Sequence, residues 1–322
     1  MNSVNFIDLK PDADHFLEDV WNGLSKQPKQ LFPKYFYDQK GSQLFDQICH
    51  LDEYYPTRTE MAILEQYSED IDQELDVKTM LIEFGSGSSI KIRKLLDQSS
   101  KIYAYLPIDI SKDHLQQAAE KINQFYPKLQ VTAICADYTK MRDFPDFPEE
   151  KGLTRAVFFP GSTIGNLSKS EAITLLQNTR NWIGNGGILI IGFDLIKDKQ
   201  VLINAYDDSK GVTAAFNFNL LERINRELNG NFQIKQFRHE ARFNEAESRI
   251  EMHLVSMVDQ TVEVGDRQFF FEKGESIHTE SSRKFLVPEF DNMAKQAGFR
   301  MLRTFTDGQE RFAVCMLKAD QV

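Results

Sequence analysis

Two glycines that directly follow an apolar run are the residues most suggestive of chemistry in this chain. Residues 81–87 read LIEFGSG, and a helical pattern follows from residue 89 to 96. A strand, a tight glycine turn and a helix start let backbone approach a nucleotide closely. A dinucleotide fingerprint would need a third glycine where this chain has Ile90, and a phosphate loop would need a Gly-Lys-Ser/Thr ending that is absent. The turn therefore favours a cofactor without pyrophosphate, such as S-adenosylmethionine, with an ordinary loop as the alternative.

Acidic residues end two further predicted strands. Asp109 ends the second strand, where a carboxylate can accept hydrogen bonds from both hydroxyls of a ribose. Asp137 and Tyr138 end the third, where the acid could bind the adenine amino group and the ring could stack on the purine. A helix-capping acid and an ordinary strand end are the alternatives. Only their positions beside the glycine turn favour cofactor binding.

A glycine-rich loop follows the fourth predicted strand. Residues 158–166 read FFPGSTIGN and contain Gly161 and Asn166. Active sites of open α/β sheets lie outside the carboxyl ends of the strands, and this strand is expected beside the first. The loop offers neutral hydrogen-bonding groups, so a substrate contact and a plain turn before the next helix are about equally supported.

Tyrosines and one polar segment complete the candidates. Five tyrosines lie outside the α/β pattern: Tyr35, Tyr37, Tyr54, Tyr55 and Tyr206. Such residues usually pack at the edge of a core, although phenols over a cofactor pocket could hold a zwitterion or a cation. Residues 280–282, Glu-Ser-Ser, are expected to form a solvated linker.

The composition restricts the class of protein. The chain has 322 residues, 41% of them hydrophobic, which suffices for a real core, and a net charge of −10 opposes sequence-independent binding of nucleic acid. Its three cysteines are Cys49, Cys135 and Cys315; the last two lie in apolar runs and are expected to be buried thiols. No metal-ligand spacing, signal peptide or membrane-length apolar run is present. We therefore expect a cytoplasmic protein without a metal.

The elements that must position these residues alternate between strand and helix. Five runs are predicted to be strands: 79–85, 102–110, 131–138, 156–161 and 187–195. Ser111 is predicted to cap one helix, and a capping box at 168–171 begins another, which Gly184 ends. This alternation predicts a parallel sheet with helices on both faces.

The pattern changes after residue 195. Residues 201–228 are predicted to be mostly helical, and residues 232–271 to form three long antiparallel strands. A last helix between Pro288 and Gly298 and two short strands would complete a seven-stranded methyltransferase-like sheet. We therefore predict one domain of residues 59–196 and 287–322, and a second of residues 1–58 and 197–286.

Several long strings closely resemble one family, the L-histidine Nα-methyltransferases of the ergothioneine pathway. The most specific are EYYPTRTE at 53–60, EFGSG at 83–87 and GSTIGNL at 161–167. Shorter matches are YFYD at 35–38, AYDD at 205–208, GVTAAFN at 211–217 and RIEM at 249–252. The similarity runs from about residue 15 to the C-terminus.

The resemblance implies both a fold and a reaction. The fold would be α/β, a Rossmann-like class I S-adenosylmethionine-dependent methyltransferase sheet with an inserted α+β histidine-binding domain. The reaction would transfer three methyl groups from S-adenosyl-L-methionine to the α-amino group of free L-histidine, giving hercynine and S-adenosyl-L-homocysteine. The only partners expected are L-histidine and its mono- and dimethyl intermediates, with no nucleic acid and no membrane. The protein is expected to be a monomer.

The resemblance also implies roles for individual residues. Those that match cofactor contacts are Gly85, Lys91, Asp109, Asp137 and Tyr138. Those that match histidine contacts are Tyr54, Asn166, Tyr206, Glu280 and Ser282. Those that line the same pocket are Tyr37, Gly161, Thr213 and Met252. Asn166 and Tyr206 would hold the carboxylate, and Tyr54, Glu280 and Ser282 would face the imidazole. Tyr37 is the candidate catalytic residue, orienting the amine directly or through water.

Alternative functions remain open. The nearest is the same chemistry on another aromatic amino acid such as tryptophan, which Glu280 and Met252 disfavour because an indole would need a wider, apolar pocket. Another is a non-catalytic S-adenosylmethionine-binding regulator, which would be expected to have lost its substrate-side groups. Ile90 disfavours a dehydrogenase, and the negative charge disfavours an RNA methyltransferase.

Overall fold

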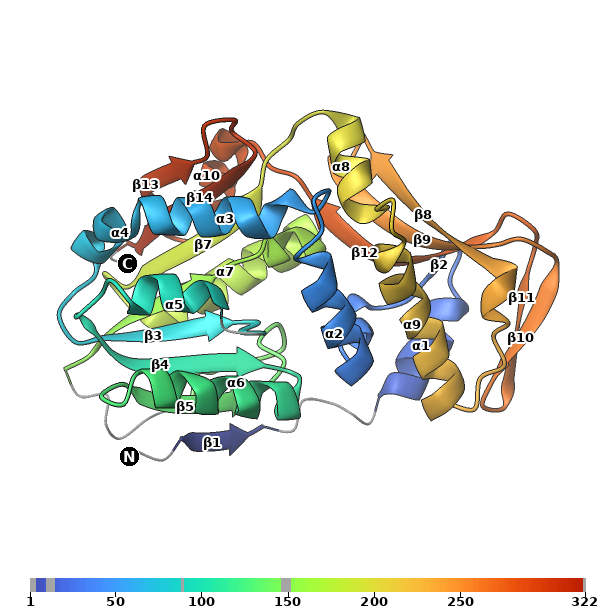
Figure 1. Cartoon of the computed structure of the whole chain (residues 1–322), viewed down its shortest axis with the longest axis horizontal. Coiled ribbons are helices and arrows are strands. Elements are labelled where there is room, and N and C mark those ends of the chain that lie inside the picture. The colour runs from blue at the N-terminus through green and yellow to red at the C-terminus, as the bar shows by residue number, and fades with distance from the viewer. Residues whose placement is uncertain (1–3, 10–14, 88–89, 146–151, 321–322) are drawn as a thin grey trace. The chain divides into compact units, whose positions relative to one another are not determined.

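The chain divides into two compact units in the computed structural model, which describes residues 4–9, 15–87, 90–145 and 152–320 (Figure 1). The first unit comprises Met1–Pro11, Pro56–Ile196 and Lys284–Val322, and the second comprises Asp12–Tyr55 and Lys197–Arg283. The sequence assigned all of residues 1–58 to the second domain, whereas strand β1 (Asn5–Asp8) pairs with β5 in the sheet of the first unit.

The first unit is built on an eight-stranded sheet of order β1-β5-β4-β3-β6-β7-β14-β13. Strand β14 runs antiparallel to β7 and β13, and all other pairs are parallel. After β1 the strands are β3 (Thr79–Phe84), β4 (Ile102–Asp109), β5 (Gln130–Cys135), β6 (Thr154–Phe159), β7 (Ile188–Asp194), β13 (Phe299–Thr306) and β14 (Phe312–Ala319). The five predicted strands and the terminal hairpin are confirmed. The predicted count of seven is wrong, because four-residue β1 is too short to show periodicity.

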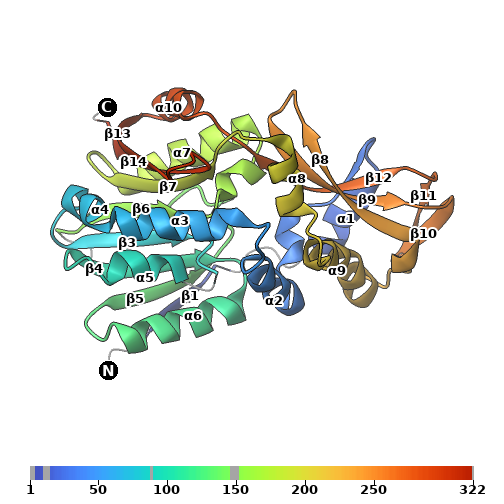
Figure 2. The same cartoon turned by 45° about the horizontal axis from the view of Figure 1, so that its top comes forward.

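Helices cover both faces of this sheet (Figures 1 and 2). They are α3 (Tyr55–Gln66), α4 (Ser68–Glu74), α5 (Ile90–Leu96), α6 (Lys112–Phe125), α7 (Lys169–Ile183) and α10 (Val287–Gln296). Alternate residues of β3 enter two separate cores: Ile82 packs in the cluster of α7 and α10, and Leu81 in the cluster of α3 to α6. The capping box of α7 and its end at Gly184 are confirmed. Ser111 stands at the N-cap of α6, but its side chain accepts no hydrogen bond from the described turn.

The second unit combines a four-stranded sheet of order β2-β12-β9-β8 with a two-stranded hairpin. Its strands are β2 (Lys29–Gln30), β8 (Phe237–Asn244), β9 (Arg249–Ser256), β12 (Ser276–Arg283) and the hairpin β10 (Gln260–Val264) and β11 (Arg267–Phe271). Its helices are α1 (Phe16–Leu24), α2 (Gln39–Ile48), α8 (Lys199–Tyr206) and α9 (Val212–Glu227), with short 3-10 turns η1 (Pro33–Phe36) and η4 (Ile234–Gln236). Helix at 201–228 is confirmed.

Two predictions for the second unit are wrong. Residues 232–271 form two long strands and a short hairpin in place of three long strands. Residues 280–282 belong to strand β12 and are not a solvated linker, and the Ser282 side chain is buried. Their polarity hid the strand, because polar residues on both faces of a strand leave no apolar alternation to detect.

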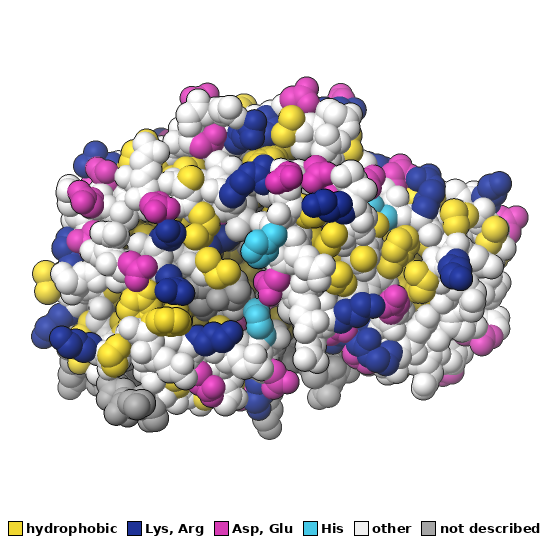
Figure 3. Space-filling model, viewed as in Figure 1, with side chains coloured by type: hydrophobic (Ala, Val, Ile, Leu, Met, Phe, Trp, Pro, Cys, Tyr) yellow, Lys and Arg dark blue, Asp and Glu magenta, His cyan; other side chains and the backbone are white. Residues whose placement is uncertain are grey.

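The described helices include none that is long and apolar enough to cross a membrane. On the face shown in Figure 3, basic side chains are interspersed with acidic ones.

Candidate functional site

The glycine turn after β3 is shaped to admit a ligand. Gly85 and Gly87 adopt φ angles of +64° and +45°, which glycine tolerates best. A Cβ added to Gly85 would meet nothing within 4 Å, so open space borders the turn. The Ser86 hydroxyl is buried and finds no hydrogen-bond partner in the described part of the chain. An orphaned buried hydroxyl beside open space fits the binding of a polar ligand.

Asp109 ties the end of β4 to the glycine turn. Its Oδ2 accepts a hydrogen bond from the Gly87 N–H at 3.2 Å, and its Oδ1 accepts one from the Ser111 N–H at 2.9 Å. Burial raises the pKa of Asp109, although these two backbone donors favour the carboxylate and oppose the rise. The helix-capping and cofactor interpretations are therefore compatible, since each oxygen keeps a further lone pair for a ligand.

Asp137 and Tyr138 lie just beyond β5. The Tyr138 ring stacks on Phe84 at a centroid distance of 4.9 Å and an interplanar angle of 7°, and meets Phe159 edge-on at 5.8 Å. Asp137 Oδ1 accepts hydrogen bonds from the backbone and hydroxyl of Thr139. The acid and the ring therefore have fixed places beside the ends of β3 and β6.

A buried carboxylate that was not predicted, Glu60 on α3, holds two predicted site residues. Its two oxygens accept the Gly161 N–H, each at 3.0 Å, and Oε2 lies 2.6 Å from the Lys91 Nζ. The Glu60 side chain is fully buried, whereas that of Lys91 is 20% exposed. The signal in the sequence was its place as the last residue of the string EYYPTRTE.

A second unpredicted acid, Glu83, ends the apolar run before the glycine turn. The Tyr105 hydroxyl donates a hydrogen bond to it, and both side chains are buried. Burial raises the pKa of Glu83 to about 8, while the Tyr105 hydrogen bond and the charge of Lys91 oppose the rise. Glu83 therefore carries its proton through most of the neutral pH range.

The loop after β6 is fixed to the end of β7. Ser162 has a φ of +60°, and its backbone N–H donates to the Gly192 carbonyl at 3.2 Å. The Ser162 hydroxyl accepts the Asp194 N–H at 2.9 Å, and Asp194 forms a fully buried ion pair with Lys284 at 2.8 Å. The 3-10 turn η3 (Thr163–Asn166) follows, so Asn166 is presented by a firmly anchored loop.

In the second unit, predicted tyrosines meet in one aromatic cluster. Tyr54 contacts Tyr206 edge-on at a centroid distance of 6.1 Å and Phe45 at 6.3 Å, and Tyr37 contacts Phe45 at 5.7 Å. The pKa of Tyr54 is raised well above its usual value by burial first, and then by Tyr206, Cys49, Glu280 and Tyr37. The Glu280 carboxyl is thus one of the groups that raise the pKa of the Tyr54 phenol.

Strand β12 brings the predicted imidazole contacts to the same core. The buried Tyr206 hydroxyl donates to the Ser282 Oγ at 2.8 Å. Glu280 lies opposite Met252 in the β12–β9 register, and Met252 belongs to the apolar cluster that contains Tyr54 and Tyr206. These contacts bring together five of the predicted substrate residues with Tyr37.

The remaining predicted residues are placed separately. Thr213 is buried in the first turn of α9, where its N–H donates to Asp208 Oδ1 at 2.7 Å. Gly161 and Asn166 belong to the first unit. An open groove of about 980 Å³ in the second unit, between residues 24–29 and 267–275, contains none of the predicted residues. Within the described residues, no group of three or more His, Cys, Asp or Glu could hold a metal ion.

Sheet topology and glycine turn together define the class of protein. The order β5-β4-β3-β6-β7, with a ligand-admitting turn after β3, is the doubly wound Rossmann-like arrangement, and antiparallel β14 completes the sheet of a class I S-adenosylmethionine-dependent methyltransferase. The chain belongs to the family described as histidine-specific, SAM-dependent methyltransferases, whose sequence model matches residues 16–319.

Individual relatives agree with this assignment. A protein of Mycobacterium tuberculosis named histidine N-alpha-methyltransferase is 40% identical over 316 residues, which cover 96% of this chain and 97% of that protein. One of the same name from Mycolicibacterium smegmatis is 38% identical over 322 residues, 98% of each chain. Ergothioneine biosynthesis protein 1 of Neurospora crassa is 30% identical over 201 residues, 62% of this chain and 23% of that one.

Proposed function

We propose that this protein transfers three methyl groups from S-adenosyl-L-methionine to the α-amino group of free L-histidine, giving hercynine as a step of ergothioneine biosynthesis. The observation that carries the proposal is the family match over residues 16–319. The first unit would be the methyltransferase domain and the second the histidine-binding domain. We further propose that the protein is cytoplasmic and acts as a monomer. Sedimentation of the purified protein would test the proposed monomer.

The residues after β3, β4 and β5 fit the cofactor. The orphaned Ser86 hydroxyl and the open space beside Gly85 leave room for a polar ligand, and Asp109 retains lone pairs for ribose hydroxyls. Asp137 and Tyr138 would bind the adenine. Lys91 would bind near the glycine turn while Glu60 holds its ammonium. When bound, S-adenosylmethionine supplies the electrophilic methyl group on its sulfonium.

Glu280 would provide selectivity for histidine. A carboxylate can accept the imidazole N–H, which phenylalanine cannot supply, and a buried acceptor left unpaired is costly. Ser282 and Tyr54 would complete the imidazole contacts, with Met252 lining the pocket. The Tyr206 hydroxyl now donates to Ser282, and a phenol has one proton. Tyr206 can therefore donate to a substrate carboxylate only by giving up this bond.

The amine must be unprotonated and aligned with the methyl group before each transfer. Positioning of this kind can supply about 7–11 kcal/mol in well-oriented reactions. Tyr37 would orient the amine, and its contacts with Phe45 and Phe216 hold the ring in the aromatic cluster. Neutral hydroxyl groups near the amine would favour the free base, because they offer no carboxylate that stabilises the ammonium form.

Mass spectrometry of the purified protein tests the proposal. The protein is incubated with S-adenosylmethionine and, separately, with histidine, tryptophan, phenylalanine or tyrosine. We expect a product three methyl groups heavier from histidine alone. Methylation of tryptophan would support the proposed reaction but show that the substrate is another amino acid. Cofactor binding without any methylated product would favour a non-catalytic S-adenosylmethionine-binding regulator over an enzyme.

A further inference from the structure

Strand β12 contains a β-bulge between His278 and Glu280. His278 lies opposite His253 of β9, whereas Glu280 lies opposite Met252, the very next residue of β9. Three residues of β12 therefore span two residues of β9, and Thr279 is the extra one. Bulges commonly re-aim side chains near functional sites.

The bulge determines which face of the sheet Glu280 occupies. Side chains of a strand alternate between faces, so if β12 paired regularly with β9 beyond His278, Thr279 would lie opposite Met252 and Glu280 opposite Glu251, on the His253 face. There two carboxylates would repel each other. With the bulge, Glu280 lies opposite Met252 and Ser282 opposite Ile250, both members of the buried apolar cluster. The bulged pairing at Thr279 thus places both predicted imidazole contacts on the core face.

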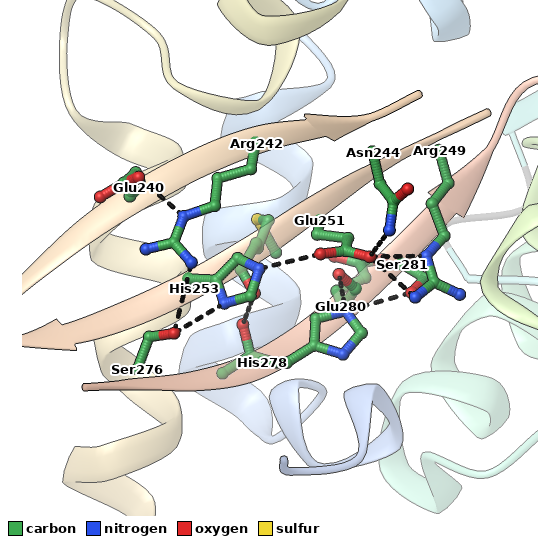
Figure 4. Close-up of polar contacts among 12 residues, drawn as sticks. Glu240, Arg242, Asn244, Arg249, Glu251, His253, Ser276, His278, Glu280 and Ser281 are labelled. Atoms are coloured by element: carbon green, nitrogen blue, oxygen red, sulfur yellow. Dashed lines mark hydrogen bonds and ion pairs between the residues drawn. The ribbon is translucent and has the colours of Figure 1, made fainter. Parts of the chain in front are cut away.

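The His278 side chain fastens the bulge from the opposite face. Its Nε2 lies 2.9 Å from the Glu280 carbonyl oxygen and 3.1 Å from the Ser281 Oγ (Figure 4). A carbonyl only accepts hydrogen bonds, so Nε2 must carry the proton. Burial lowers the pKa of His278, which favours the neutral ring. The ring also stacks on His253 at a centroid distance of 5.2 Å, which fixes its orientation.

The core face holds the bulge through Thr279. The Thr279 hydroxyl lies within hydrogen-bond distance of the Asn217 Oδ1, at 2.8 Å, and of the Met252 carbonyl, at 3.1 Å. Asn217 Nδ2 lies 2.9 Å from His239 Nδ1, and His239 Nε2 lies 2.8 Å from the Tyr206 carbonyl. A chain of buried and part-buried hydrogen bonds therefore joins the bulge to the segment that carries Tyr206.

We propose that His278 is a positioning residue, which sets the place of Glu280 by bonding its carbonyl across the bulge. The inference rests on the proposed function, in which Glu280 recognises the imidazole. His278 itself contacts no substrate, because its ring lies on the opposite face of the sheet from Glu280 and Ser282. Its effect is therefore transmitted through the backbone of residues 279–281.

Steady-state kinetics of the full chain tests the proposal. His278→Phe keeps a ring but removes the donor, and we expect the KM for histidine to rise about tenfold, with the KM for S-adenosylmethionine changed less than about twofold. His278→Gln retains an N–H donor and should recover most of the loss. His253→Phe is the matched control, since it keeps a ring that can stack on His278 and removes an imidazole whose hydrogen bonds go to Ser276 and Glu251; its KM for histidine should stay within about twofold of the original.

A double-mutant cycle separates positioning from general damage. In the Glu280→Ala background, His278→Phe should add less than about a twofold effect on the KM for histidine, because the side chain it positions is gone. The same tenfold loss in that background would overturn the proposal, and so would an unchanged KM in folded His278→Phe. If that variant does not fold, Thr279→Val, which loosens the bulge from the core face, should raise the same KM. Failure of the unmutated protein to methylate histidine would overturn the proposed function and this inference together. If the unmutated protein methylates histidine and the variants keep its KM for histidine, only the inference is overturned.

Discussion

Replacement of Glu60 by glutamine should destabilise the first unit far more than a surface change of the same kind. Glu60 is fully buried and holds both the Gly161 N–H and the Lys91 ammonium. Glutamine keeps one oxygen that can accept the Gly161 N–H, but its NH2 group would point at the Lys91 ammonium, which is itself a donor. The change removes the charge that compensates Lys91 and leaves the shape of the side chain almost intact.

The structure gives the expected magnitude. Hydrogen bonds to charged groups contribute about 1.5–3 kcal/mol, and removal of one partner from a buried ion pair costs about 3–5 kcal/mol. The Lys91 side chain is 20% exposed, so water can solvate part of its ammonium. We therefore expect Glu60→Gln to lower the free energy of unfolding by about 2–3 kcal/mol. The affinity for S-adenosylmethionine should fall as well, because Gly161 and Lys91 lose their common anchor.

A matched control lies on the same two helices. Glu65 of α3 pairs with Lys94 of α5 at 3.0 Å, but these side chains are 69% and 32% exposed. Glu65→Gln should therefore cost less than about 0.5 kcal/mol. Urea unfolding in a common Trp21→Phe background would follow the first unit through the buried Trp182. Equal losses in the two glutamine variants would refute the assignment of Glu60 as a buried anchor.

Three further predictions concern other titratable or polar groups. Glu280→Ala should weaken histidine binding at least about tenfold while leaving S-adenosylmethionine binding nearly unchanged, and equal losses in calorimetry would exclude the selectivity role. Burial lowers the pKa of His253 to about 4, so as the pH falls the imidazole is protonated in the unfolded chain before it is protonated in the folded protein. The free energy of unfolding should therefore fall by about 3 kcal/mol between pH 6.5 and pH 4. A His253→Gln variant whose stability shows the same pH slope would contradict this. Burial raises the pKa of Glu83 to about 8, so the contribution of this carboxyl to the free energy of unfolding is lost as the pH rises from 4.5 to 8. Urea unfolding at pH 7 should show Glu83→Gln to be more stable than the original protein by about 3 kcal/mol. An unchanged or lower stability of the variant would count against this prediction.

The sequence predicts the first unit well because its central strands are buried on both faces. Every residue of β3 and β7 is buried, and most are apolar, so residues 80–82 and 188–191 appear as apolar runs that mark the two strands. The capping box at Ser168 is local chemistry, and it is found where its four residues predict it. Asp109 was also placed correctly, since the end of a parallel strand fixes where its next side chains lie.

Residues whose roles depend on distant partners could not be predicted from local pattern. Glu60 is one of two acids on α3, and nothing within the helix shows that it meets the Gly161 N–H from a loop 101 positions further along the chain. Tertiary packing decides whether a charged side chain is buried, whereas helical periodicity predicts only which face of a helix is buried on average. The family strings flagged this position without explaining it.

The Glu280 segment shows why a predicted site residue can be assigned to the wrong secondary structure. The letters of β12, SIHTESSR, have polar residues at both parities, so alternation cannot show which side chains face the core. That choice is made by pairing with β9, whose Ile250, Met252 and Leu254 supply the apolar face, and by the extra residue Thr279. A strand of this kind resembles a linker in sequence, because its pairing with β9, and not its own residue pattern, determines which side chains face the core. One residue inserted between Thr279 and Glu280 would turn the Glu280 side chain to the His253 face, so it should alter the proposed histidine selectivity as strongly as replacement of Glu280 itself.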